Sequence, residues 1–158
     1  LPGTRLAGLL EADARLHATL QERPQVLAGA REKLAPYIAQ GRCTLEDADF
    51  LGEVAAGADV YVFSRVLHNW DDDSCRKILA NCAAAMGPRS QLLIVERVMP
   101  DDRHPWLSRA FDVHMMIMTE GRERTAGEYE ALLRPAGLRT LELRELAAEM
   151  RVLVAVPV

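Results

Sequence analysis

The sequence predicts an α/β fold: a doubly wound, mostly parallel, Rossmann-like sheet that closes with an antiparallel hairpin. Residues 58–63 and 90–96 are short, uninterrupted apolar runs, which are typical of strands buried on both faces of a parallel sheet. The acid-rich run that starts at Asp71 suits a helix N-terminus, and apolar residues then recur at helical spacing up to a Gly-Pro pair. Apolar runs at 138–143 and 150–156, with a polar stretch between them, predict the hairpin at a sheet edge.

The same alternation of strand and helix extends upstream. Residues 16–21 and 42–47 have the composition of two further strands. The segment from Pro24 to Leu34 predicts a helix between them. We therefore expect the N-terminal third of the chain to add to the same doubly wound sheet.

Two further helices are expected before the hairpin. Residues 105–119 are rich in methionine and apolar groups and read as a helix, followed by a glycine turn. Thr125 is followed three residues later by Glu128, which is the pattern of a capping box at a helix start. Pro135 should end this second helix, because proline cannot continue the hydrogen-bond ladder.

The composition indicates a single globular domain that covers residues 1–158. Of the 158 residues, 49% are hydrophobic, which is enough for a normal core, and no repeat or linker divides the chain. A net charge of −4 with scattered basic residues argues against a nucleic-acid partner. No apolar run is long enough to cross a membrane and no secretory signal is visible, so we expect a cytoplasmic protein.

The three cysteines do not form a recognisable metal motif. Cys43, Cys75 and Cys82 lack Cys-x-x-Cys spacing and a nearby histidine. We expect them to be small core residues, and we predict no metal site.

Polar residues that follow the predicted strands are the candidates for a site, because ligands of open α/β sheets bind at the carboxyl ends of the strands. His68 follows one strand and Glu96 ends the next, so the two side chains can meet at one edge. A neutral imidazole can take a proton near neutral pH, and a carboxylate on its other nitrogen would stabilise the imidazolium. By spacing alone, a histidine near an acid is more often a surface or capping group, so both interpretations stay open.

Three motifs resemble one enzyme family. The motifs are Arg-Val-Leu-His-Asn-Trp-Asp-Asp at 65–72, Leu-Ile-Val-Glu at 93–96 and Gly-Arg-Glu-Arg-Thr at 121–125. Together, in this order and spacing, they resemble the plant caffeate-type and bacterial polyketide-tailoring O-methyltransferases. The resemblance covers nearly the whole chain, and it implies an S-adenosylmethionine-dependent enzyme with the doubly wound fold already expected.

The resemblance also implies the reaction and its main residues. His68 matches the general base that deprotonates the acceptor hydroxyl, and Glu96 and Glu123 match the acids that flank it. The acceptor is then a small aromatic or polyketide-type molecule. A phenol with a pKa of about 10 is a poor nucleophile at pH 7, so removing its proton during attack makes it competent for methyl transfer.

Further positions are implied to bind the cofactor and the acceptor, each with an ordinary structural alternative. Glu22 could be merely solvated, Phe50 could be core, and Trp70 could pack at a helix start. Methionines at helical spacing are core as often as they line a pocket. The positions implied for the cofactor are Gly3, Glu22, Asp49, Phe50, Ser64 and Trp70, and those for the acceptor are Asp112, Met115 and Met116.

The chain departs from the family's usual pattern at its start. The first strand of the family's sheet and the N-terminal dimerisation domain have no counterpart, so we expect the chain to begin inside the glycine-rich loop, where only Gly3 is retained. The full-length parent is then expected to be a homodimer. One alternative is a non-catalytic or repurposed module of the same fold. A nicotinamide-binding domain is a second, but the chain lacks a Gly-x-Gly-x-x-Gly loop.

Overall fold

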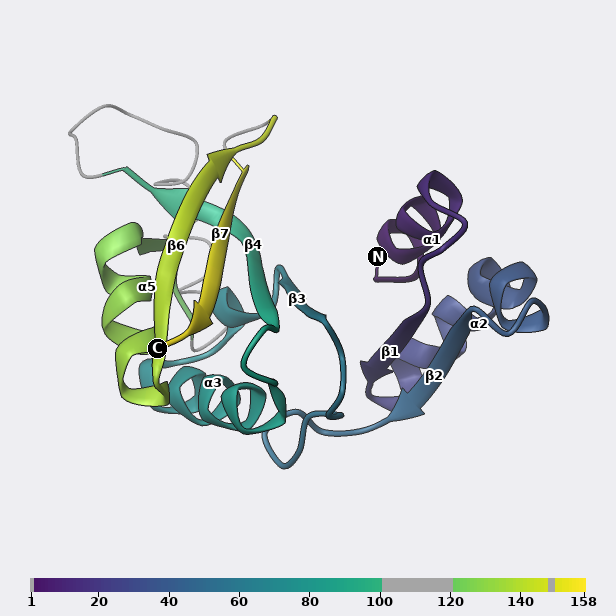
Figure 1. The fold of residues 1–158 in the computed structure, drawn as a ribbon, viewed down its shortest axis with the longest axis horizontal. Coiled ribbons are helices and arrows are strands. Elements are labelled where there is room, and N and C mark those ends of the chain that lie inside the picture. The colour runs from purple at the N-terminus through teal and green to yellow at the C-terminus, as the bar shows by residue number, and fades with distance from the viewer. Residues whose placement is uncertain (1, 101–120, 148–149) are drawn as a thin grey trace. The chain divides into compact units, whose positions relative to one another are not determined.

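The computed structural model describes residues 2–100, 121–147 and 150–158. Its internal contacts separate the chain into two compact units, residues 1–55 (unit 1) and residues 56–158 (unit 2). The two units are described separately below (Figure 1). None of the described helices combines the length and the apolar character needed to cross a membrane.

Unit 1 is a two-stranded parallel sheet with two helices. Its elements in chain order are α1 (Pro2–Ala12), β1 (Ala18–Glu22), α2 (Pro24–Ala39) and β2 (Cys43–Asp47). β1 and β2 pair in parallel, from Ala18 opposite Cys43 to Glu22 opposite Asp47. Both predicted strands and the helix between them are confirmed, and α2 continues beyond the predicted Leu34. α1 was not expected from the sequence.

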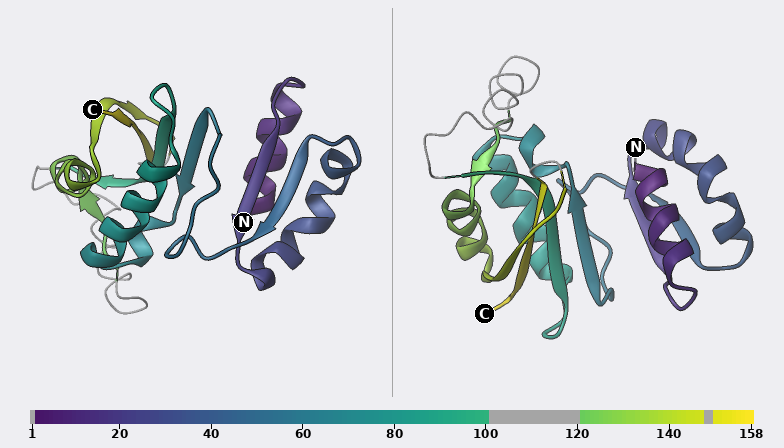
Figure 2. Two further views of the ribbon diagram at one scale, coloured as in Figure 1. Left: turned by 60° about the horizontal axis from the view of Figure 1, so that its bottom comes forward. Right: turned by 90° about the horizontal axis from the view of Figure 1, so that it is seen from above.

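The core of unit 1 is entirely apolar. Leu10 of α1, Ala30 and Leu34 of α2 and Cys43 of β2 form one buried cluster. Both helices therefore pack on the same face of the β1–β2 pair, as Figure 2 also shows. The remaining apolar side chains around the cluster are half-buried.

Unit 2 contains a five-stranded mixed sheet. The path runs β3 (Val60–Ser64), β4 (Gln91–Met99), β7 (Met150–Pro157) and β6 (Leu138–Glu145), and the two-residue strand β5 (Arg124–Thr125) pairs with β4. β3 and β5 are parallel to β4, whereas β7 is antiparallel to both β4 and β6. The two strands predicted at 58–63 and 90–96 and the antiparallel terminal hairpin are confirmed.

Two helices cover one face of this sheet. α3 (Asp72–Ala85) begins where the Asp71 carboxylate accepts a hydrogen bond from the Ser74 backbone N–H at 2.7 Å. α5 (Ala126–Leu133) begins with the predicted capping box, in which Thr125 and Glu128 exchange both hydrogen bonds. α3 and α5 contact each other, and the 3-10 turn Arg134–Ala136 with left-handed Gly137 ends α5. The helix predicted at 105–119 lies outside the described residues.

The three cysteines are free and buried, as predicted. Cys43 lies in the core of unit 1, and Cys75 and Cys82 are buried side chains of α3. Burial raises the pKa of the Cys75 thiol to about 11 and that of Cys82 to about 12. Both thiols are therefore protonated near neutral pH and act as small core groups.

Candidate active site

A tight turn after β3 carries His68. The backbone N–H of Arg65 still bonds the Val95 carbonyl at 3.0 Å, but Arg65 has a left-handed φ of 58° that turns the chain away from the sheet. The next residues form a 3-10 turn, Leu67–Asn69, in which His68 is buried. A left-handed conformation costs a residue other than glycine about 1 kcal/mol, so the tertiary contacts of this turn must hold it in place.

Glu96 on β4 stabilises this turn by contacts to Val66 and Arg65. Alternate residues of β4 are buried, and Glu96 occupies a position in that buried series that would otherwise suit an apolar side chain. Its Oε1 accepts the backbone N–H of Val66 at 2.9 Å, and its Oε2 lies 3.5 Å from Arg65 Nη1. Burial raises the pKa of Glu96 above its ordinary value, although the His68 and Arg65 charges oppose the shift.

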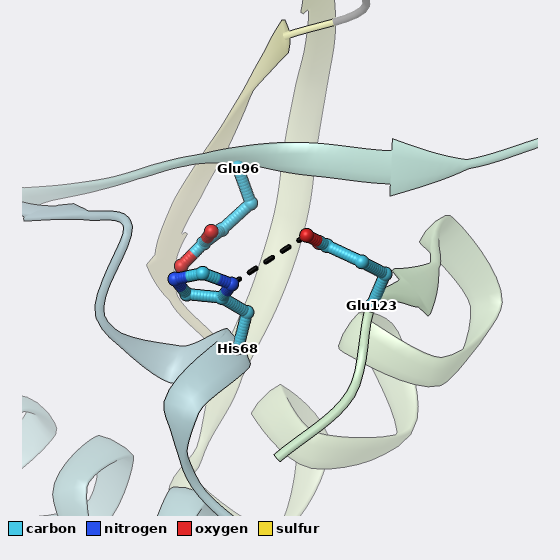
Figure 3. Close-up of side chains that lie close together, drawn as sticks. All are labelled: His68, Glu96 and Glu123. Carbon is cyan, nitrogen blue, oxygen red and sulfur yellow. Dashed lines mark ion pairs between the residues drawn. The ribbon is translucent and has the colours of Figure 1, made fainter. Parts of the chain in front are cut away.

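Glu123, which immediately precedes β5, contacts the imidazole directly. Its Oε1 lies 3.5 Å from His68 Nδ1 and 3.1 Å from Arg65 Nη1. Figure 3 shows the Glu96 and Glu123 carboxylates approaching the ring from two different segments of the chain. Burial acts to raise the pKa of Glu123, but the adjacent imidazole and Arg65 outweigh it and hold this pKa below its ordinary value.

The charges of this cluster nearly balance through Arg65, which was given no role from the sequence. Its guanidinium lies against both carboxylates and is 19% exposed. One ligand atom from each of His68, Glu96 and Glu123 lies within 4.8 Å of the others, which is also a metal-binding composition. Because Arg65 already places a cation beside both acids, the described residues offset much of the negative charge themselves.

Two more residues of the 121–125 segment hold the turn in position, and neither was identified from the sequence. Gly121 lies so close to the turn that an added Cβ would stand 1.9 Å from the His68 carbonyl oxygen. Arg124 is fully buried, and its guanidinium bonds the Leu67 and Trp70 carbonyls on either side of His68. The sequence signal that could have identified these residues was the 121–125 motif itself, in which three consecutive charged residues lie at or just before a short strand.

The residues implied for the cofactor are distributed over both units. In unit 1, Glu22 ends β1 and Asp49 and Phe50 follow β2. Because β1 and β2 are parallel and in register, these three residues lie at the same end of the pair. In unit 2, Ser64 ends β3 and Trp70 follows the His68 turn, and both side chains are half-buried.

The sequence predicted that Gly3 lies in a loop, but the structure places it in a helix. It lies in the first turn of α1, where an added Cβ would stand 3.0 Å from the Cα and Cβ of Ala30 in α2. Close packing of the two helices is therefore sufficient to explain a glycine here. The acceptor positions Asp112, Met115 and Met116 lie outside the described residues.

Comparison with known proteins agrees with the resemblance drawn from the motifs. The O-methyltransferase domain model matches residues 11–139, and so spans parts of both units. The mitomycin biosynthesis 6-O-methyltransferase of Streptomyces lavendulae is 40% identical over 138 residues, which are 87% of this chain and 39% of that protein. The phenazine O-methyltransferase PhzM of Lysobacter antibioticus is 33% identical over 156 residues, which are 99% of this chain and 46% of that protein.

A solved structure gives the same result for the fold. CalO1, a methyltransferase of calicheamicin biosynthesis crystallised with SAH bound, superposes with a TM-score of 0.87 at 34% identity, covering 99% of this chain and 46% of that one. The chain thus spans less than half the length of these relatives. It has the Rossmann-like fold of S-adenosylmethionine-dependent methyltransferases, and it belongs to the O-methyltransferase domain family.

Proposed function

We propose that the full-length protein transfers a methyl group from S-adenosylmethionine to a hydroxyl of a small aromatic or polyketide-type molecule, with His68 as the general base. The observation that carries the proposal is the buried imidazole of His68, with Glu123 Oε1 3.5 Å from Nδ1 and Glu96 close by. Three separate segments of unit 2 converge to make this arrangement. Two relatives are named as a phenazine O-methyltransferase and a mitomycin biosynthesis O-methyltransferase, and these names support the proposed class of acceptor.

The geometry assigns the two ring nitrogens different tasks. An ionised carboxylate can only accept a hydrogen bond, so Glu123 favours the tautomer with the proton on Nδ1. The lone pair on Nε2 is then available to take the proton of an acceptor hydroxyl. Glu123 stabilises the imidazolium as it forms, and Arg65 helps to keep Glu123 ionised.

The chemistry of the strand ends fits the cofactor. Glu22 offers a half-buried carboxylate of the kind that binds a ribose diol, and Asp49 with Phe50 offers an acceptor and an aromatic face for adenine. Asp49 also accepts the Leu51 backbone N–H at 3.0 Å, which orders the turn that presents it. When bound, the cofactor supplies a sulfonium methyl group that is open to in-line attack.

The His68→Gln variant of the full-length protein tests the role of the base. Glutamine keeps a polar group in the turn but cannot take up a proton at neutral pH. We expect kcat to fall by about 10²–10⁴-fold, the usual contribution of a general base, while cofactor affinity by titration calorimetry is unchanged. Turnover close to that of the wild type with a panel of phenolic and matched anilinic acceptors would contradict the proposal.

Titration of this chain with S-adenosylmethionine and S-adenosylhomocysteine tests the cofactor part separately. Micromolar binding that weakens in Glu22→Gln supports the cofactor role that we propose for Glu22. Binding by the full-length protein without methyl transfer to any hydroxyl acceptor would favour a non-catalytic module of the same fold. Light scattering of the full-length protein tests the homodimer that we propose for it.

A further inference from the structure

We propose that Arg124 is the positioning residue that fixes the His68 imidazole relative to Glu123. The inference rests on the proposed role of His68, because a position is worth fixing only if the ring performs a reaction. Among the described residues, no hydrogen bond or ion pair joins Arg124 to the imidazole. Arg124 acts through the backbone on both sides of His68 and through its own neighbour in sequence, Glu123.

The contacts of Arg124 are unusually complete for a buried cation. Its side chain is fully buried. Nη1 bonds the Leu67 carbonyl at 3.1 Å and Nη2 bonds the Trp70 carbonyl at 2.8 Å. Nε and Nη2 both reach Asp72 Oδ1, at 3.0 and 2.8 Å. One planar group thus ties together both ends of the His68 turn and the first residue of α3.

The position of Arg124 in the chain directs these hydrogen bonds, called here the Arg124 clamp, at the His68–Glu123 pair. Glu123 is the adjacent residue, so the backbone that presents the carboxylate is tied to the backbone that presents the imidazole. β5 anchors the same backbone to β4, with Arg124 opposite Val98. A shift of the guanidinium would therefore change the separation of His68 and Glu123 without altering either side chain.

Arg122 offers a natural control two residues earlier. It also binds Asp72, with Nη2 2.9 Å from Oδ2, and it pairs with Glu128 at 2.9 Å. However, its side chain is 44% exposed, and no hydrogen bond from it to the His68 turn is present among the described residues. The two arginines share a carboxylate partner, a segment and a charge, but only Arg124 is bonded to the carbonyls on either side of His68.

The decisive comparison is Arg124→Lys against Arg122→Lys in the full-length protein. Lysine keeps the charge but cannot reproduce the planar set of donors that serves the backbone carbonyls and Asp72 together. Because a misplacement of about 1 Å can cost about 100-fold, we expect Arg124→Lys to lower kcat by about that factor with cofactor affinity unchanged. Arg122→Lys should keep both values near those of the wild type.

The ring itself provides a readout that does not depend on turnover. Side-chain ¹⁵N resonances of His68, identified by their loss in His68→Gln, report which ring nitrogen carries the proton. In the wild type and in Arg122→Lys we expect the proton to remain on Nδ1. In Arg124→Lys we expect a mixture of tautomers, because Glu123 no longer holds the ring in one orientation.

Each result has a definite meaning. Loss of kcat together with a changed His68 spectrum, in Arg124→Lys only, supports the positioning role. Equal losses in both lysine variants, or an unchanged His68 spectrum in Arg124→Lys, would overturn it. If His68→Gln retained turnover, the proposed function would fail, but the spectra would still decide whether Arg124 sets the ring.

A second variant serves if Arg124→Lys does not fold. Asp72→Asn removes the carboxylate charge that pairs with the Arg124 guanidinium. The Asp72 side chain is one-third exposed, so the change leaves the buried arginine and its carbonyl partners in place. We expect a smaller loss of kcat and a smaller change in the His68 spectrum. The same effects in Arg122→Lys would show that the Asp72–Arg122 pair, and not Arg124, is responsible.

Discussion

Unit 1 and unit 2 bury different kinds of residue. Among the described residues, every buried charged or histidine side chain belongs to unit 2: His68, Glu96, Glu123 and Arg124. The buried side chains of unit 1 are all apolar, and its polar candidates for the cofactor lie half-buried or exposed at strand ends. Buried charges are costly unless they are paired, so unit 2 holds the His68 imidazole in one position at the expense of stability.

The comparison separates two kinds of functional site. The cofactor role that we propose for Glu22 and Asp49 needs only polar side chains at strand ends, on the apolar core of unit 1. The general base that we propose for unit 2 needs its tautomer and orientation fixed before the reaction, which favours buried and mutually paired charges. Mutations should therefore affect unit 1 through its packing and unit 2 through its charges and close backbone contacts.

The largest change in stability is expected from Leu34→Ala in unit 1. Leu34 is completely buried in the apolar cluster, and a leucine-to-alanine change in a core costs about 2–5 kcal/mol. Hydrogen exchange should show lost protection in β1, β2 and α2, while β4 and β7 keep theirs. Equal loss in both units would mean that they unfold as one cooperative body, and the comparison would break down.

A smaller effect is expected from Gly121→Ala at the site in unit 2. The added methyl group would stand 1.9 Å from the His68 carbonyl oxygen, so the turn must shift, at a cost of about 1–3 kcal/mol. Methyl transfer by the full-length protein should fall with it. The matched control is Gly127→Ala in α5, where only Thr125 Oγ1 lies within reach at 4.0 Å, and which should stabilise by roughly 0.5 kcal/mol. Thermal melts of both variants distinguish a local clash from a general intolerance of alanine.

The finest test compares Glu123→Gln with Glu96→Gln as a function of pH. The pKa of Glu123 is lowered, so its stabilisation is present above the ordinary carboxyl pKa and is lost as the pH falls through the folded-state value. Glu123→Gln should therefore be less stable than the wild type by about 1–3 kcal/mol at pH 7, and the difference should shrink on acidification. Urea denaturation at several pH values between about 3 and 7 measures this.

Glu96→Gln should behave in the opposite way. Its pKa is raised by burial, so its contribution to stability is present at low pH and is lost as the pH rises through the folded-state value. Glutamine fixes a neutral group there and can still accept the Val66 N–H, so the variant should be at least as stable as the wild type at pH 7. A loss at pH 7 as large as that of Glu123→Gln would show that both acids act only as structural anchors.

The sequence alone determined the order and type of most described elements. Apolar runs predicted β3 and β4, the Thr125–Glu128 pattern predicted the start of α5, and the polar break predicted the terminal hairpin. These features depend on local periodicity and capping, which are written in adjacent residues. The pairing of parallel strand ends also suggested that His68 and Glu96 would meet.

Tertiary structure alone decided which contacts make the site. Three contacts of the site join residues more than 50 positions apart in the sequence: Arg65 with Glu123, Gly121 with His68, and Arg124 with Leu67. No local sequence pattern encodes contacts over such separations. In unit 1, the close approach of Gly3 to Ala30 likewise joins residues that are distant in sequence. Helix propensity and capping act within a few residues, whereas the orientation of a buried charge depends on every group that surrounds it in the folded chain.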